Sequence, residues 1–321
     1  MPDGTLHELA AGTTVDGASA KPNSVFLTSG ITGTVVEAIA WKLIDQGTLD
    51  AELVLATWLP DYPNADLITV RMLLDELSGL GDPYTSLLVP SITADPERTW
   101  SLQEVVNLMA AVPPSATPGT FTTPTPDTVR LVIAYVLEQV TGRTVAELID
   151  TMVAKPLGLD DTSLADGSNQ PANFSEGLFV LDGSLIDTRI AKRAYLTMGG
   201  ASWGLQSTTA DLANLVESLM SGQFLGAERA PTADHFSADR ATSDGLAWVP
   251  IGVPFSGYRP CTGDTPTFTS YGKAVSETGT AVTMLTFPDG ISIVLHLNAT
   301  PIEGAALRAL VLPIHDIIAN N

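Results

Sequence analysis

Cysteine is nearly absent from this sequence: Cys261 is the only one among 321 residues. A single thiol cannot form an internal disulfide or a cluster of thiolate metal ligands. The four histidines have no metal-ligand spacing with one another, so we expect neither a metal site nor a cofactor. Any functional site is therefore expected to consist of protein side chains without a metal ion or a cofactor.

Basic residues are also scarce. Lys and Arg number 15 against 36 Asp and Glu, which gives a formal net charge of −21. Such a surface repels nucleic acid and anionic membranes, so we expect neither as a partner. No apolar run reaches about 18 residues, the length that a membrane-spanning helix needs. The opening residues carry no export signal, so the chain as written is expected in the cytoplasm; had such a signal been trimmed from it, the protein would be secreted.

The residues that are present favour a globular protein with helices in its middle. Hydrophobic residues make up 45% of the chain and charged residues 16%. Ser101 with Glu104 and Thr144 with Glu147 have the spacing of capping boxes. Apolar residues at helical spacing predict helices at 34–46, 69–77, 101–110, after Asp127 and after Thr144.

The C-terminal third has a different pattern. The sequence TAVTMLTF-PDG-ISIVLHLN, residues 280–298, consists of two β-rich runs around a Pro-Asp-Gly turn and predicts a hairpin. An amphipathic helix is expected at about 302–319, where it can pack on the sheet.

These elements, in this order, resemble the serine β-lactamase and penicillin-binding-protein superfamily, in particular its class C β-lactamase, D-alanyl-D-alanine carboxypeptidase and esterase branch. The resemblance is carried by residues 43–80, 140–164, 204–215 and the terminal hairpin. It implies an α/β fold in which an antiparallel sheet flanked by helices adjoins a mainly helical subdomain, with a cleft between them.

The resemblance also implies how the chain is divided. Residues 1–60 and 200–321 would form the sheet subdomain and residues 61–199 the helical one, together making one β-lactamase-like domain. The family usually has a helix and a first strand before the segment that begins this chain. Their absence makes an exchanged strand or a homodimer a hypothesis to test.

The motifs of the family's cleft are replaced in this sequence. The family uses Ser-x-x-Lys on its first long helix, Tyr-x-Asn on a loop, and Lys-Thr-Gly or His-x-Gly on a strand. The resemblance places these motifs on Gly30-Ile31-Thr32-Gly33, Thr125-Pro126-Asp127 and Lys273-Ala274-Val275, and it places a frequent family histidine on Glu76.

These replacements argue against the family's covalent chemistry. A glycine has no side chain to acylate, and without the lysine a neighbouring hydroxyl has no local base. A shift of one residue would offer Ser29 as nucleophile, but Thr32 then stands where the lysine should be, and no lysine lies between Lys21 and Lys42.

Other groups remain that could act in the cleft. The helix start at Gly30 could bind a carbonyl or anionic oxygen, and the two glycines would widen the cleft floor. Lys273 and Asp127 are the candidate acid–base residues. Further candidates for contact with a ligand are Gly30, Gly33, Thr125, Glu76, Trp203, Tyr271 and Val275.

Each candidate also has a purely structural interpretation. Asp127, directly before a helix, fits an N-cap. Lys273 fits a solvated or ion-paired strand residue, and aromatic residues such as Trp203 and Tyr271 usually serve packing. Glu76 stands near a helix C-terminus, where a negative charge is unfavourable, which indicates a partner.

Three functional hypotheses follow. In the first, the old cleft has been repurposed for non-covalent chemistry on a small molecule, such as cyclisation, isomerisation or elimination. In the second, the chain is an inert pseudoenzyme that binds a small ligand or a protein partner. In the third, it is an altered hydrolase that uses Ser29 or Thr32.

Overall fold

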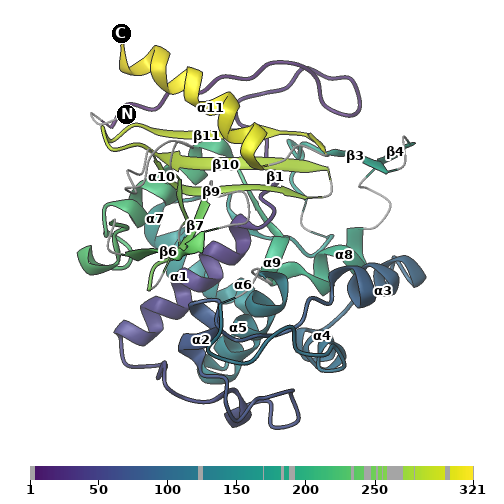
Figure 1. Ribbon diagram of the computed structural model, residues 1–321. Coiled ribbons are helices and arrows are strands. Elements are labelled where there is room, and N and C mark those ends of the chain that lie inside the picture. The colour runs from purple at the N-terminus through teal and green to yellow at the C-terminus, as the bar shows by residue number, and fades with distance from the viewer. Residues whose placement is uncertain are drawn as a thin grey trace.

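The largest layer of this computed structural model is a six-stranded antiparallel sheet with the strand order β11-β10-β9-β8-β7-β6. Figure 1 shows this sheet between α11 and the other helices. Its strands are β6 (Phe236–Ala241), β7 (Ala247–Pro250), β8 (Ser256–Tyr258), β9 (Ser270–Glu277), β10 (Thr280–Thr286) and β11 (Ser292–Leu297). The structure describes residues 4–121, 126–168, 170–181, 184–187, 192–232, 235–241, 247–250, 252–254, 256–258, 270–277, 279–300 and 304–320.

The predicted C-terminal hairpin is confirmed. β10 and β11 pair antiparallel from Ala281 opposite Leu297 to Thr286 opposite Ser292, around the Pro-Asp-Gly turn. Gly290 in this turn has a φ of 83°, a backbone conformation that glycine adopts without steric cost. The predicted terminal helix is α11 (Gly304–Ala319), which packs on β9, β10 and β11, while α10 (Thr209–Met220) packs on β10 and β11. Nearly all of β10 is buried as a result.

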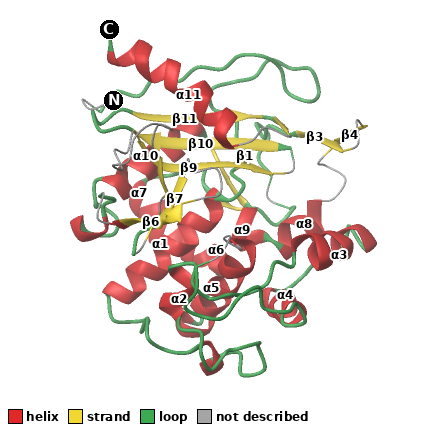
Figure 2. Cartoon of the chain, viewed as in Figure 1, coloured by secondary structure: helices red, strands yellow, loops and turns green. Residues whose placement is uncertain are grey.

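The helical part of the molecule is packed around α1 (Ile31–Asp45), which contacts α5 and α9. Figure 2 shows it as a group of helices below the sheet. Its other helices are α2 (Val70–Leu74), α3 (Val89–Ala94), α4 (Leu102–Met109), α5 (Pro126–Thr141), α6 (Val145–Leu148), α7 (Lys155–Leu157), α8 (Lys192–Met198) and α9 (Gly200–Trp203). Short 3₁₀ or π turns occur at Leu55–Thr57, Tyr84–Leu88, Ile149–Ala154 and Ala227–Arg229.

The chemistry of the helix starts follows the sequence prediction. Both predicted capping boxes are present: Ser101 with Glu104 opens α4, and Thr144 with Glu147 opens α6. Each box satisfies backbone N–H groups that a helix start leaves unpaired. The predicted α/β architecture, an antiparallel sheet flanked by helices beside a mainly helical region, is confirmed.

The described residues also form two small sheets. In the first, β5 (Leu205–Ser207) lies between β1 (Phe26–Leu27) and β2 (Ser163–Leu164); in the second, β3 (Leu178–Leu181) lies between β12 (Ala299–Thr300) and β4 (Ser184–Asp187). Between residues 4 and 24 the structure has an isolated Thr13–Ser19 bridge but neither a helix nor a longer strand. The pairing of β1 with β5 holds the chain directly before it enters α1.

Candidate active site

The turn from β1 into α1 is held tightly against β5. The Thr28 N–H donates to the Leu205 carbonyl at 2.8 Å. The Thr32 hydroxyl donates to the Ser29 carbonyl at 2.8 Å and accepts the Leu205 N–H at 2.9 Å. These bonds fix the start of α1 relative to the sheet, and they commit the Thr32 hydroxyl to the backbone.

Ser29, at the centre of this turn, has an unusual environment. Its φ is 55°, a backbone conformation that costs a non-glycine residue on the order of 1–3 kcal/mol and that is often found at functional sites. Its side chain is 1% exposed, and its Oγ has no hydrogen-bond partner among the described residues. Gly30 follows as the N-cap of α1, without a side chain to cap the helix. The start of α1 thus presents a strained serine, while the N–H groups of Ile31 and Thr32 donate to the carbonyls of Thr28 and Ser29 at 3.3 and 3.0 Å.

The space beside Gly33 is filled from another helix. A Cβ placed on Gly33 would lie 1.9 Å from Cδ of Arg130, 2.0 Å from its Nε and 2.7 Å from its Cζ. Arg130 belongs to α5, so a side chain from α5 occupies the volume that any side chain at position 33 would need.

Arg130 is held there by a buried ion pair. Its Nε lies 3.2 Å from Oε1 of Glu37 on α1, and the two side chains are 4% and 12% exposed. Burial removes water from both groups, and their mutual attraction compensates part of the lost hydration.

Lys273 on β9 belongs to the same electrostatic environment. Burial and, after it, the positive charge of Arg130 lower the pKa of its amine to about 8, against the opposing effect of Glu37 and Glu76. A lysine with a pKa near 8 carries an appreciable fraction of free amine at neutral pH. The Lys273 amine of β9 is thus influenced by one further cation on α5 and by two carboxylates, one on α1 and one just beyond the end of α2.

The other predicted site residues lie at different depths. Glu76, just beyond α2, has a φ of 56°. Tyr271 and Val275 lie on β9, where Tyr271 is partly buried and Val275 packs against the core. Trp203 is 1% exposed and packs edge-on against Tyr84, with its indole N–H donating to the Tyr195 carbonyl at 3.1 Å.

Two predicted residues lie outside the described part of the site. The backbone of Asp127 forms part of the first turn of α5, but its side chain is outside the described residues, and so is Thr125. Among the residues that the structure describes, no group of three His, Cys, Asp or Glu is placed to hold a metal ion.

Sequence reasoning missed Arg130 and Glu37. A signal was available: each is a charged residue between apolar residues of a helix, in Val-Arg-Leu at 129–131 and Val-Glu-Ala at 36–38. Charged residues within an apolar helix stretch are rarely buried unless they pair.

A sequence model of the β-lactamase family matches residues 2–310. The chain belongs to the β-lactamase family. Its sequence is 25% identical over 191 residues to esterase EstB of Burkholderia gladioli, a match that covers 51% of this chain and 47% of that protein. This chain therefore spans about half the length of that curated relative.

Solved structures share this fold. A penicillin-binding protein from Bacillus halodurans matches with a TM-score of 0.78 at 18% identity, over 95% of this chain and 91% of that one. The D-amino acid amidase of Ochrobactrum anthropi matches with a TM-score of 0.75 at 19% identity, over 97% and 90%. No helix in the described part of this family member is long and apolar enough to cross a membrane.

Proposed function

We propose that this β-lactamase-family protein hydrolyses ester or amide bonds of small molecules, with Lys273 as the general base and without a Ser-Lys pair. The observation that carries the proposal is the lowered pKa of the Lys273 amine, about 8, inside a cluster of buried charges. At pH 7 a group with this pKa is unprotonated in roughly one molecule in ten. That fraction is sufficient for a base that acts on a bound water.

The proposed reaction needs no covalent intermediate. The Lys273 amine takes a proton from water while the water oxygen attacks the carbonyl carbon of the substrate. The Arg130 guanidinium stabilises the negative charge that develops on the carbonyl oxygen. The bond to the leaving alcohol or amine then breaks, and the Lys273 ammonium returns the proton to that group.

In this proposal Gly30 and Gly33 stand at the serine and lysine positions of the family. Arg130 occupies the volume that a side chain of Gly33 would need. This contact supports the proposal, because α5 retains a cation where α1 no longer supplies one. The names of the relatives, an esterase and an amidase, favour hydrolysis over cyclisation, isomerisation, elimination or inert binding.

A second candidate is an acyl-enzyme hydrolase that uses Ser29 as its nucleophile. The observation that favours it is the Ser29 Oγ itself, which is buried without a partner among the described residues on a strained backbone. Thr32 is a weaker choice because its hydroxyl bonds with the backbone at Ser29 and Leu205.

The test is hydrolysis of a panel of p-nitrophenyl esters and of D- and L-amino acid p-nitroanilides by the wild type, Lys273→Met, Lys273→Arg and Ser29→Ala. We expect both Lys273 variants to lose at least about 100-fold in kcat/KM, because neither Met nor Arg can accept a proton at neutral pH. The wild-type rate should rise with pH and level off above about pH 8, since the free amine is the active form.

The same experiment separates the two candidates. In the Lys273 mechanism Ser29→Ala keeps most of the activity and the intact mass of the enzyme does not change during turnover. An initial burst, a mass increase equal to one acyl group and inactivity of Ser29→Ala would instead establish the acyl-enzyme. Absence of turnover by the wild type across the panel would refute both.

A further inference from the structure

A pocket other than the Lys273 site borders α5 at Leu131 and Glu138. It is formed by the start of α4 with the segment before it, and by α5, α6, β2, α8 and α9, and its volume is about 180 Å³. A dry protein cavity of about 150 Å³ can hold benzene, so this pocket has room for one small ring. Glu138 in its wall is eight residues from Arg130 on α5, about 12 Å along the helix axis.

The lining of the pocket is apolar with an acidic component. Leu131, Val145 and Leu164 supply apolar surface. The two ionisable residues that line it are Glu138 and Asp166, and neither Lys nor Arg is among the described residues of its wall. This combination favours a ligand with an apolar body and a positive charge.

Glu138 is the acidic group that the fold holds in place. Its Oε1 accepts the N–H of Val145, the first residue of α6, at 3.0 Å. Burial raises the pKa of this carboxyl group, and the nearby charge of Glu147 acts in the same direction. A ligand cation beside Glu138 would relieve both effects, because it would replace lost hydration and oppose the charge of Glu147.

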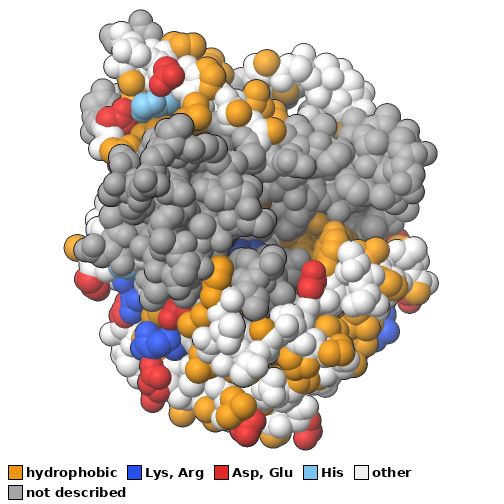
Figure 3. Space-filling model, in the orientation of Figure 1, with side chains coloured by type: hydrophobic (Ala, Val, Ile, Leu, Met, Phe, Trp, Pro, Cys, Tyr) orange, Lys and Arg blue, Asp and Glu red, His pale blue; other side chains and the backbone are white. Residues whose placement is uncertain are grey.

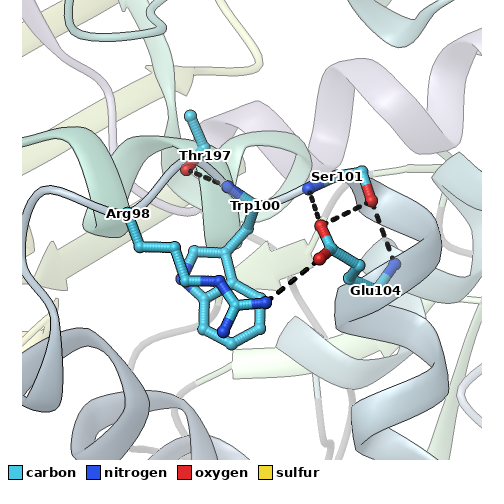
Figure 4. A network of polar contacts seen from close by, with 5 residues as sticks. All are labelled: Arg98, Trp100, Ser101, Glu104 and Thr197. Carbon is cyan, nitrogen blue, oxygen red and sulfur yellow. Dashed lines mark hydrogen bonds and ion pairs between the residues drawn. The ribbon is translucent and has the colours of Figure 1, made fainter.

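Trp100 forms a rigid part of the wall. Figure 4 shows how it is held: its backbone N–H donates to the Thr197 hydroxyl at 3.0 Å, and the Arg98 guanidinium lies 3.5 Å from the ring centroid. Arg98 in turn pairs with Glu104 at 3.0 Å. The Trp100 indole N–H is buried and has no acceptor among the described residues. Buried donors are rarely left unpaired, so an acceptor on a ligand fits here.

We propose that this pocket is a second binding site, and that it takes a small organic amine of about eight non-hydrogen atoms with an apolar ring or chain and an oxygen acceptor. The ammonium group pairs with Glu138, the apolar body lies against the leucine and valine side chains, and the oxygen accepts from Trp100. This site is independent of the proposed hydrolytic function.

The test is isothermal titration with three matched probes: 4-aminocyclohexanol, cyclohexylamine and cyclohexanol. For a ligand of this size we expect the amino alcohol to bind the wild type with a Kd of about 0.1–1 mM. Cyclohexylamine, which lacks the acceptor, should bind several-fold more weakly, and cyclohexanol, which lacks the charge, at least about tenfold more weakly.

Three variants locate the binding. Glu138→Gln preserves the acceptor for Val145 and should weaken both amines at least about tenfold without changing the affinity for cyclohexanol. Ala146→Trp, at an exposed position of the pocket wall, should exclude all three probes by filling the space. Lys273→Met should leave binding unchanged, because it lies in the other site.

Several outcomes would overturn the proposal. One is the absence of amine binding to the wild type at 10 mM, which would leave the pocket to water only. Another is amine binding that survives both Glu138→Gln and Ala146→Trp. A third is binding that Lys273→Met abolishes, which would move the ligand to the Lys273 site. Thermal unfolding of each variant, measured in parallel, identifies a variant that fails to fold.

Discussion

The guanidinium of Arg130 occupies the volume beside Gly33 where a side chain of α1 would otherwise lie. This arrangement couples two positions that are 97 residues apart in the sequence, because Gly33 must lack a side chain for Arg130 to reach Glu37. The first prediction concerns this coupling. Gly33→Ala should displace Arg130 from its ion pair and lower the free energy of unfolding by about 2–4 kcal/mol, since it leaves Glu37 without its partner in a buried position.

A double-mutant cycle measured by urea unfolding checks this prediction. Arg130→Ala alone should also destabilise, but the double variant Gly33→Ala/Arg130→Ala should lose clearly less stability than the sum of the two single variants. Gly200→Ala is the matched control, because a Cβ there meets only Leu164 at an ordinary 3.9 Å. Its effect should stay below about 1 kcal/mol. Additive losses at positions 33 and 130 would contradict the steric coupling.

Among the elements, β11 and β1 are joined by a ring contact that makes stability depend on pH. His296 of β11 stacks on Phe26 of β1 with 3.7 Å between the ring centroids and 3° between the ring planes. Burial lowers the pKa of His296 from its ordinary 6.5 to about 3. The folded protein therefore keeps this imidazole neutral, whereas the unfolded chain binds a proton as the pH falls below 6.5.

The second prediction follows from that difference. The free energy of unfolding should fall as the pH is lowered from about 6.5 toward 3. Above about 6.5 the imidazole is neutral in both states, so His296 should not make stability depend on pH there. His296→Phe retains a ring on Phe26 but cannot bind a proton, so it should flatten the pH dependence in this window. Urea unfolding at several pH values checks it, with Phe26→Leu as a control that loses the stack but keeps the imidazole. Equal slopes for His296→Phe and the wild type would rule out His296 as the source.

The local elements were predictable because their signals lie within a few residues of one another. The capping boxes at Ser101 and Thr144 and the 280–298 hairpin each depend on adjacent side chains. The Gly33–Arg130 contact was not predictable, since it joins two helices whose packing only the whole fold determines. The positive φ of Ser29 was not predictable either, since no residue pattern near it requires this backbone conformation.

At the scale of the whole molecule, the order of the elements was enough to indicate the family, whereas the chemistry of the site was not. Lys273 was recognised from its register with a family motif, but the pKa of its amine depends on tertiary structure: burial and Arg130 lower it, against the opposing charges of Glu37 and Glu76, and these groups come from distant parts of the chain. On the face in Figure 3, acidic and basic side chains are dispersed among apolar and other residues. Over the whole chain, however, acidic residues outnumber basic ones by 36 to 15.

The last prediction concerns this excess of negative charge. Mutual repulsion of a net −21 opposes the compact state, and added salt screens it as the Debye length falls from about 20 Å at 20 mM to about 6 Å at 300 mM. Salt also weakens exposed ion pairs such as Arg71–Glu52 and Lys155–Asp150, but each of these contributes at most about 1 kcal/mol. The melting temperature at pH 7 should therefore rise between these two salt concentrations. Sodium chloride and choline chloride should act alike, because screening depends on ionic strength rather than on the cation. A lower melting temperature in both salts would mean that the ion pairs outweigh the repulsion.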